Sequence, residues 1–309
     1  MLYVRMEKTK MSKHSVAKII TALEITEGAG VTVFRTIGSP SCRNLDPFLL
    51  LDHMSSDNPD EYIAGFPEHP HRGFVTFTYL IDGHLRHKDS MGNQGELKAG
   101  GAQWMKAASG VIHSEMPQQV EGLLKGFQLW INLPKSEKMS CPEYKEIKPD
   151  SVPTINQKEK TVRVLAGDYE GCSGPPFIKH EYASWQWGYG AYPHAVEARI
   201  ADIGNNTLPG NHTAILYVFE GEANVSQTLV SQFNLAILKP DNSDEACSDV
   251  EIWAGPEGAR MLLVTGKPIG EPILQYGPFV MNERAEIEQA IKDFEDGTLV
   301  KSKADMQEI

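Results

Sequence analysis

Two short motifs in the first half of the chain carry side chains that could bind a metal ion. FPEHPHRGF places His69 and His71 two residues apart, and GVIHSE places His113 and Glu115 at the same spacing. In a β-strand, residues two apart project from the same face, so each pair can present both of its groups to one point. Two such strands running antiparallel would surround one volume with three imidazole nitrogens and one carboxylate.

This donor set is typical of a site for a divalent transition metal. Calcium and magnesium prefer shells of oxygen atoms, and a structural zinc site usually includes thiolates. A six-coordinate ion held by four such groups keeps two positions open, where a bidentate substrate or dioxygen would bind. The bland alternative, that each histidine is a surface or hydrogen-bonded residue, is weakened because the spacing occurs twice. The donor set alone leaves iron, manganese, nickel, copper and zinc open.

Four other histidines are predicted not to bind the metal. His84 and His87 lie three apart in HLRHKD, so they face opposite sides of a strand, and one of them could lie behind the ligands. His53, at a strand end, is predicted to be buried and hydrogen-bonded, and His212 stands alone. Because the second half has no HxH motif and no histidine after His212, we expect one metal site per chain, in the first half.

Short runs of β-type residues separated by turns dominate the chain from Val31 onward and must position these motifs. Asp82 and Gly83 predict a two-residue hairpin turn between FVTFTYLI and HLRHKD, and SMGN at 90–93 predicts the next turn. Consecutive hairpins indicate an antiparallel sandwich or barrel. Similar runs resume after Lys160, where LYVFEG matches TYLIDG of the first half; this suggests an internal duplication, with two unrelated hairpins as the alternative.

The domain boundaries follow from changes in composition and in the hydrophobic pattern along the sequence. We divide the chain into a flexible N-terminal extension (1–15), a metal-binding domain (16–140), a polar, proline-containing linker (141–160), a second β-domain without metal (161–280) and a C-terminal helix (281–300). The helix is predicted because apolar residues recur at helical spacing after Asn282, which can cap. Met11 is an alternative to Met1 as the native start.

Composition argues against several classes of function. The 41 acidic and 29 basic residues give a formal net charge of -12, which would repel a phosphate backbone, so direct nucleic-acid binding is not expected. No apolar stretch reaches the roughly eighteen residues of a membrane span, and no signal peptide is recognisable. We therefore expect a cytoplasmic protein, or a nuclear one if it is eukaryotic, and a monomer. The cysteines form no CxxC pair and are read as reduced structural thiols: Cys42, Cys141, Cys172 and Cys247.

The chain resembles the pirin family, two-domain members of the cupin superfamily. The resemblance runs from about Val16 to Gly297 through FPEHPHRGF, TYLIDGHLRHKDSMGNQGEL, GGAQWMKAASGVIHSEMPQ, GFQLWINLP and FVMNERAEIEQAIKDF. It implies an all-β fold of two antiparallel β-barrels (cupin, jelly-roll-like) with a short C-terminal helix and metal in the N-terminal barrel only. It also implies one Fe(II) per chain, held by His69, His71, His113 and Glu115. Val75 departs from the glutamate that is common in the family, and the resemblance implies that iron binding survives this change.

The resemblance further implies a quercetin 2,3-dioxygenase, since several pirins are described as such. On this hypothesis the partners are a flavonol and dioxygen, and Glu115 is the catalytic base that accepts the 3-hydroxyl proton. Phe66, Phe74 and Met116 could line an aromatic entrance, although core packing is favoured for each. The second hypothesis is a non-enzymatic pirin that senses iron or redox state and binds a protein partner. Sugar isomerisation on a cupin scaffold has little support, because the fold hosts many reactions.

Overall fold

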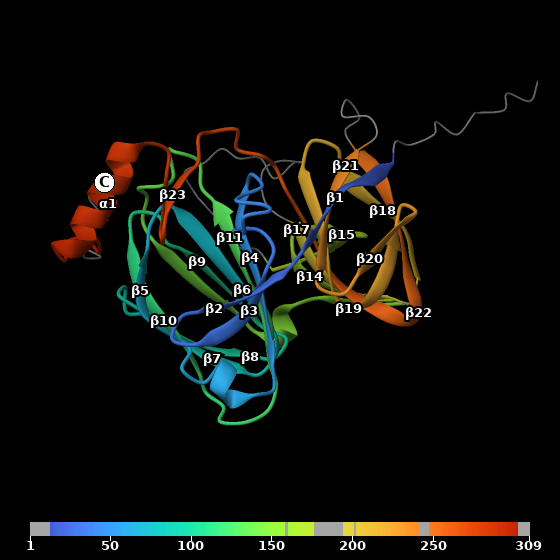
Figure 1. The fold of residues 1–309 in the computed structure, drawn as a ribbon, viewed down its shortest axis with the longest axis horizontal. Coiled ribbons are helices and arrows are strands. Elements are labelled where there is room, and N and C mark those ends of the chain that lie inside the picture. The colour runs from blue at the N-terminus through green and yellow to red at the C-terminus, as the bar shows by residue number, and fades with distance from the viewer. Residues whose placement is uncertain (1–12, 158–159, 176–193, 201, 241–246, 302–309) are drawn as a thin grey trace, which may run out of the picture.

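Alternation of apolar and polar residues turns most of the chain into short antiparallel strands. The computed structural model describes residues 13–157, 160–175, 194–200, 202–240 and 247–301. In β8 (Gln94–Lys98), Gly95 and Leu97 are buried while their neighbours are partly or fully exposed. β4 (Phe48–Ser56) is instead buried over its first seven residues, which fits its continuous apolar run. Two β-rich bodies lie side by side in Figure 1, one from each half of the chain.

The first body contains two antiparallel sheets of seven and four strands. In spatial order the larger sheet is β12 (Glu143–Ile147), β9 (Ala102–Lys106), β6 (Phe74–Asp82), β11 (Leu124–Asn132), β4, β3 (Val31–Arg35) and β2 (Leu23–Glu27). The smaller sheet is β5 (Phe66–His71), β10 (Val111–Pro117), β7 (His84–Asp89) and β8. Leu80 of β6 and Leu85 of β7 belong to one buried cluster, so the two sheets share a core.

The predicted hairpin at Asp82 and Gly83 is wrong. β6 pairs with β9 and β11, whereas β7 pairs with β8 and β10, so Gly83 marks the corner where the chain leaves one sheet for the other. Gly83 has φ +98°, and a Cβ there would lie 2.7 Å from Oε1 of Gln119. The predicted turn at 90–93 is confirmed, because β7 and β8 pair directly across it.

The second body is one nine-stranded antiparallel sheet. Its main order is β1 (His14–Thr21), β21 (Asn234–Pro240), β19 (Thr213–Val225), β22 (Cys247–Gly266), β17 (His194–Ile200), β14 (Lys160–Ala166) and β13 (Thr154–Asn156). β20 (Thr228–Ser231) pairs with β19, and β18 (Asp202–Pro209) pairs with β22. The first part of β22 pairs with β18 and its last part with β17, so this long strand carries the sheet around a barrel. A short two-stranded antiparallel ribbon, β15 (Asp168–Tyr169) and β16 (Cys172–Ser173), follows β14 in the sequence.

Both ends of the described chain cross to the opposite body. β1 pairs with β21, so residues 14–21 extend the sheet of the second half. The segment of β23 (Leu274–Tyr276), β24 (Phe279–Met281) and α1 (Arg284–Glu295) returns to the first half, where α1 lies beside β5 in Figure 1. The N–H of Val280 donates to the carbonyl of Arg72 at 3.0 Å, directly after β5. The predicted boundaries placed residues 16–21 in the first domain and 274–280 in the second, opposite to this exchange, because strand pairing across the domains is not visible in local sequence.

The predicted linker contains regular structure as well. β12 completes the larger sheet of the first body, and β13 opens the sheet of the second. Between them lies the 3-10 turn η2 (Pro149–Ser151), and a similar turn, η1 (Pro59–Glu61), precedes β5. Of the predicted N-terminal extension, residues 1–12 lie outside the described part of the chain, while residues 14 and 15 begin β1.

One apolar core joins the two bodies. The rings of Phe127 from β11 and Phe219 from β19 lie 5.1 Å apart, and both contact the imidazole of His53. His53 is buried, and its Nδ1 lies 3.2 Å from the hydroxyl of Tyr217, which confirms its predicted structural role. Burial lowers the pKa of His53 to about 3, so this imidazole is neutral in the core.

The predicted C-terminal helix is confirmed, and α1 packs against β24 with Ile287 and Ala290 buried. Its cap is Glu283 and not Asn282: the side chain of Glu286 accepts from the backbone of Glu283 at 2.9 Å in a capping box. No helix in the described residues is long and apolar enough to cross a bilayer.

Candidate metal centre

The register of two paired strands brings the histidine motifs together. β5 and β10 run antiparallel, and His113 lies directly opposite His69. A register shift follows, so that Glu115 pairs with Phe66. The predicted arrangement of the two motifs on facing strands is therefore confirmed, with a bulge between His113 and Glu115 that the spacing did not indicate.

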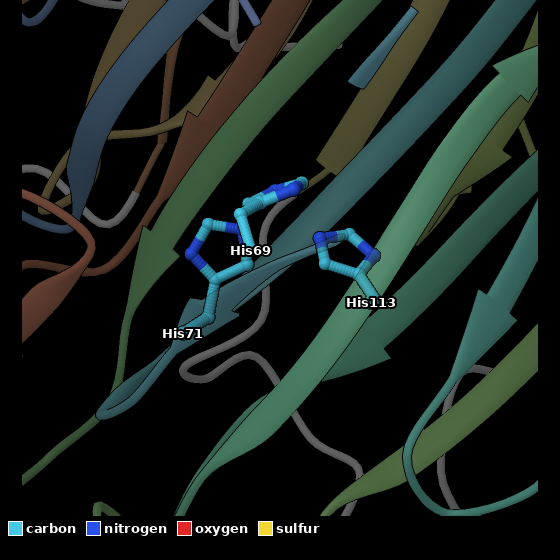
Figure 2. A group of neighbouring side chains, drawn as sticks. All are labelled: His69, His71 and His113. Atoms are coloured by element: carbon cyan, nitrogen blue, oxygen red, sulfur yellow. The ribbon is translucent and has the colours of Figure 1, made fainter. Parts of the chain in front are cut away.

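Three imidazoles converge on one point, as Figure 2 shows. One ring nitrogen from each of His69, His71 and His113 lies within 4.8 Å of the others. The ring centroids of His69 and His113 are 4.4 Å apart, and those of His71 and His113 are 4.9 Å apart. His71 and His113 are buried while His69 is partly exposed, so solvent reaches the group from the side of His69.

The protonation of this group suits metal binding. Burial lowers the pKa values of His71 and His113 well below the usual range, so both rings are neutral and carry a lone pair. Nδ1 of His69 donates to the carbonyl of Pro67 at 2.7 Å, which leaves its Nε2 free to ligate. Within the described part of the chain, Nδ1 of His71 and Nε2 of His113 have no hydrogen-bond partner. Two buried, unpartnered nitrogens are costly, and a metal ion would satisfy both. The residues therefore fit a transition metal.

Glu115 lies outside the close group of histidines. Its buried carboxylate accepts from Nε2 of Gln128 at 3.0 Å through Oε2, and from the Gln103 amide through Oε1. The hydroxyl of Thr78 lies 3.1 Å from the same Oε1. Ligation by Glu115 stays a prediction, since the carboxylate points toward the larger sheet.

Three polar partners of Glu115 were not predicted from the sequence. Thr78, Gln103 and Gln128 come from β6, β9 and β11, inside the apolar runs FVTFTYLI, AQWMKA and FQLWINL. A polar residue in the middle of a buried strand needs a partner, so these positions did carry a signal.

The predicted division of His84 and His87 is confirmed. His84 points outward, where Nε2 lies 2.6 Å from the Glu96 carboxylate, and His87 is buried behind His113. His87 also contacts Asp89. Burial alone would raise the pKa of Asp89, but hydrogen bonds from His87 and Asn93 lower it overall.

Aromatic side chains close the wall beside His71. Phe74 is fully buried, and its ring lies 4.3 Å from that of Trp130. Both rings contact the imidazole of His71 at 5.1 Å. Phe74 thus serves core packing, the favoured interpretation, and Trp130 is a neighbour of the site that the sequence analysis missed. Val75 is buried in the core between the two bodies.

Comparisons with known proteins agree with this architecture. The sequence model "Pirin" matches residues 30–131, and "Pirin C-terminal cupin domain" matches residues 196–300. A Pseudomonas aeruginosa protein provisionally named quercetin 2,3-dioxygenase is 43% identical over 92% of this chain and 97% of its own length. Mouse pirin is 34% identical, over 92% of this chain and 93% of its own. A crystal structure of quercetin 2,3-dioxygenase from Acinetobacter baumannii superposes with a TM-score of 0.79 at 32% identity, covering 94% of this chain and 98% of that one.

Proposed function

Because this chain belongs to the pirin family, we propose that it is a metal-dependent dioxygenase that cleaves a flavonol such as quercetin with molecular oxygen. The metal is one Fe(II) per chain, and its ligands are His69, His71, His113 and Glu115. The observation that carries the proposal is the group of three imidazoles whose nitrogens lie within 4.8 Å of one another, two of them buried and neutral. The names of the bacterial relative and of the Acinetobacter structure support the reaction class.

The metal, when bound, supplies a Lewis acid for a substrate oxygen and open positions for small ligands. The pairing of β5 with β10 already holds the three rings close together. Glu115 is the base that takes the proton of the flavonol 3-hydroxyl. Two amide N–H groups, from Gln103 and Gln128, orient its carboxylate. The electron-rich enolate that results reacts with dioxygen, and cleavage of the ring releases carbon monoxide.

Turnover by the iron-loaded protein tests the proposed reaction. Protein loaded with Fe(II) under anaerobic conditions should, on admission of oxygen, bleach the flavonol absorbance of quercetin and consume oxygen. Glu115→Gln, with its iron content verified, should lose this activity, because an amide cannot accept the proton. If the protein at full metal occupancy turns over quercetin no faster than free iron does, the proposed dioxygenase activity is refuted.

A second candidate is an iron- or redox-sensing module that binds a protein partner. The contact between the site and the C-terminal segment favours it: Arg72, the residue after His71, donates its backbone N–H to the carbonyl of Pro278 at 3.3 Å and pairs with Asp293 of α1 at 2.7 Å. A change at the ion would thus reach a surface helix. If the protein has this sensing function, hydrogen exchange of α1 should differ between Fe(II)- and Fe(III)-loaded protein. Identical exchange in the two forms would refute the sensing function.

A further inference from the structure

A row of buried polar side chains lies behind His113, on the side away from His69 and His71. Nδ1 of His113 lies 3.4 Å from Nδ1 of His87, and Nε2 of His87 lies 3.2 Å from Oδ2 of Asp89. The side chains of His87 and Asp89 are each 1% exposed. The pairing of β7 with β10 places this row, because Asp89 lies opposite His113 and His87 lies opposite Glu115.

Asp89 sets the direction of the hydrogen bonds along the row. Its Oδ1 accepts from the backbone N–H groups of Met91 and Asn93 at 3.0 and 2.9 Å, and its Oδ2 accepts from Nδ2 of Asn93 at 2.8 Å. A carboxylate among these donors is an acceptor, so the hydrogen shared with His87 belongs to Nε2 of that ring. In the tautomer with its hydrogen on Nε2, Nδ1 of His87 carries a lone pair. Nδ1 of His113 therefore carries a hydrogen, and its Nε2 keeps the lone pair.

We propose that His87 and Asp89 are positioning residues that hold His113 in the tautomer able to bind a metal through Nε2. This inference rests on the metal site of the proposed function and is independent of the flavonol reaction. Nε2 of His113 is the nitrogen without a partner among the described residues. Ligating histidines commonly donate their second ring N–H to an outer group, which fixes both tautomer and orientation. In this protein a second imidazole takes that place, with a carboxylate behind it.

The ring of His87 is itself held in place. Tyr144 of β12 stacks on it, with centroids 4.3 Å apart and planes at 11°. Gly95 of β8 makes room for Tyr144, since a Cβ there would lie 1.9 Å from the tyrosine hydroxyl. The imidazole therefore cannot turn away from His113 without displacing the stacked tyrosine.

Metal affinity tests the proposal without turnover. His87→Phe keeps a ring against Tyr144 but removes the acceptor, whereas His87→Asn keeps an acceptor oxygen near the position of Nδ1. We expect His87→Phe to weaken Fe(II) binding about 10- to 100-fold in anaerobic competition with a chromophoric chelator. His87→Asn should recover most of that loss. His84→Phe, the same change on the outer face of β7, should bind Fe(II) as the unaltered protein does. Equal affinities for His87→Phe and the unaltered protein would overturn the proposal.

The tautomers can be read directly in the metal-free, full-length protein. Nitrogen NMR of labelled histidines should show hydrogen on Nδ1 of His113 and on Nε2 of His87. Asp89→Asn should reverse both, because its amide would donate to Nε2 of His87. Hydrogen on Nε2 of His113 in the unaltered protein would refute the inference. A protein with the expected tautomers and Fe(II) affinity but no flavonol cleavage would refute the proposed reaction and leave the positioning role intact.

Discussion

The buried ion pair between Arg72 and Asp293 is expected to hold the C-terminal helix on the metal-binding body. The side chain of Arg72 is 2% exposed and that of Asp293 is 22% exposed, with NH1 and Oδ2 2.7 Å apart. Hydrogen bonds to a charged group contribute about 1.5–3 kcal/mol. Replacing Asp293 with alanine regains about 0.5 kcal/mol of helix propensity. The net cost of Asp293→Ala is therefore about 1–2.5 kcal/mol of helix docking.

A matched control lies on the same helix. Glu288 pairs with Arg284 at 2.9 Å, but their side chains are 63% and 88% exposed, so the pair contributes about 0.3–0.5 kcal/mol. This loss is roughly cancelled when alanine replaces the glutamate.

Hydrogen exchange of the α1 amides, followed by mass spectrometry at constant pH, measures the docking directly. Asp293→Ala should speed exchange of α1 about five- to seventyfold, while Glu288→Ala should change it less than about twofold. Exchange in β22 should stay the same in both variants. Equal acceleration in the two variants, or none in Asp293→Ala, would show that the pair with Arg72 does not hold the helix.

Three further predictions concern the metal, the shared core and pH. A His69→Ala, His113→Ala double variant should lose the bound metal in elemental analysis, and undiminished metal would refute the assignment of the ligands. Phe127→Ala should lower the free energy of unfolding by about 3–5 kcal/mol in urea, because it empties the buried contact between the two bodies; Phe294→Ala, at a residue 42% exposed, should cost far less, and equal shifts would contradict the shared core. Burial would raise the pKa of Asp293, but hydrogen bonds from Arg72 and Gln289 lower it overall, so its contribution is present above about pH 4 and is lost as the pH falls through the folded-state pKa. Exchange of α1, corrected for its intrinsic rate, should therefore accelerate as the pH falls below about 4, and an equal acceleration in Asp293→Ala would argue against this carboxylate.

The spacing of the ligand motifs was readable because it depends on local geometry alone. His69 and His71 share a face in any extended strand, because side chains two residues apart point the same way. The separation of His84 from His87 followed from the same period, and the structure places one outside and one behind the site. The turn at 90–93 was also a local signal, since β7 and β8 are consecutive strands.

The corner at Gly83 shows where local signals fail. An acidic residue and a glycine between two β-type runs fit a hairpin and a crossing between sheets equally well, because both need a backbone with positive φ. Which of the two forms depends on the partners of each strand, and the partners of β6 are β9 and β11 rather than β7. The same holds for the exchanged ends: nothing local to residues 14–21 tells that β1 pairs with β21 of the second half.

By itself, the sequence determined the strand content, the C-terminal helix, the shared face of His69 and His71 and the presence of a histidine cluster in the first half. Each of these follows from residue type and a period of two or 3.6 residues. Only the tertiary structure decided that His113 lies opposite His69 with a register shift before Glu115, that Glu115 is held by amides from the larger sheet, and that His87 lies behind His113 with Asp89. These relations join residues from separate strands, and the register of each pairing is set by packing over the whole barrel rather than by any one segment.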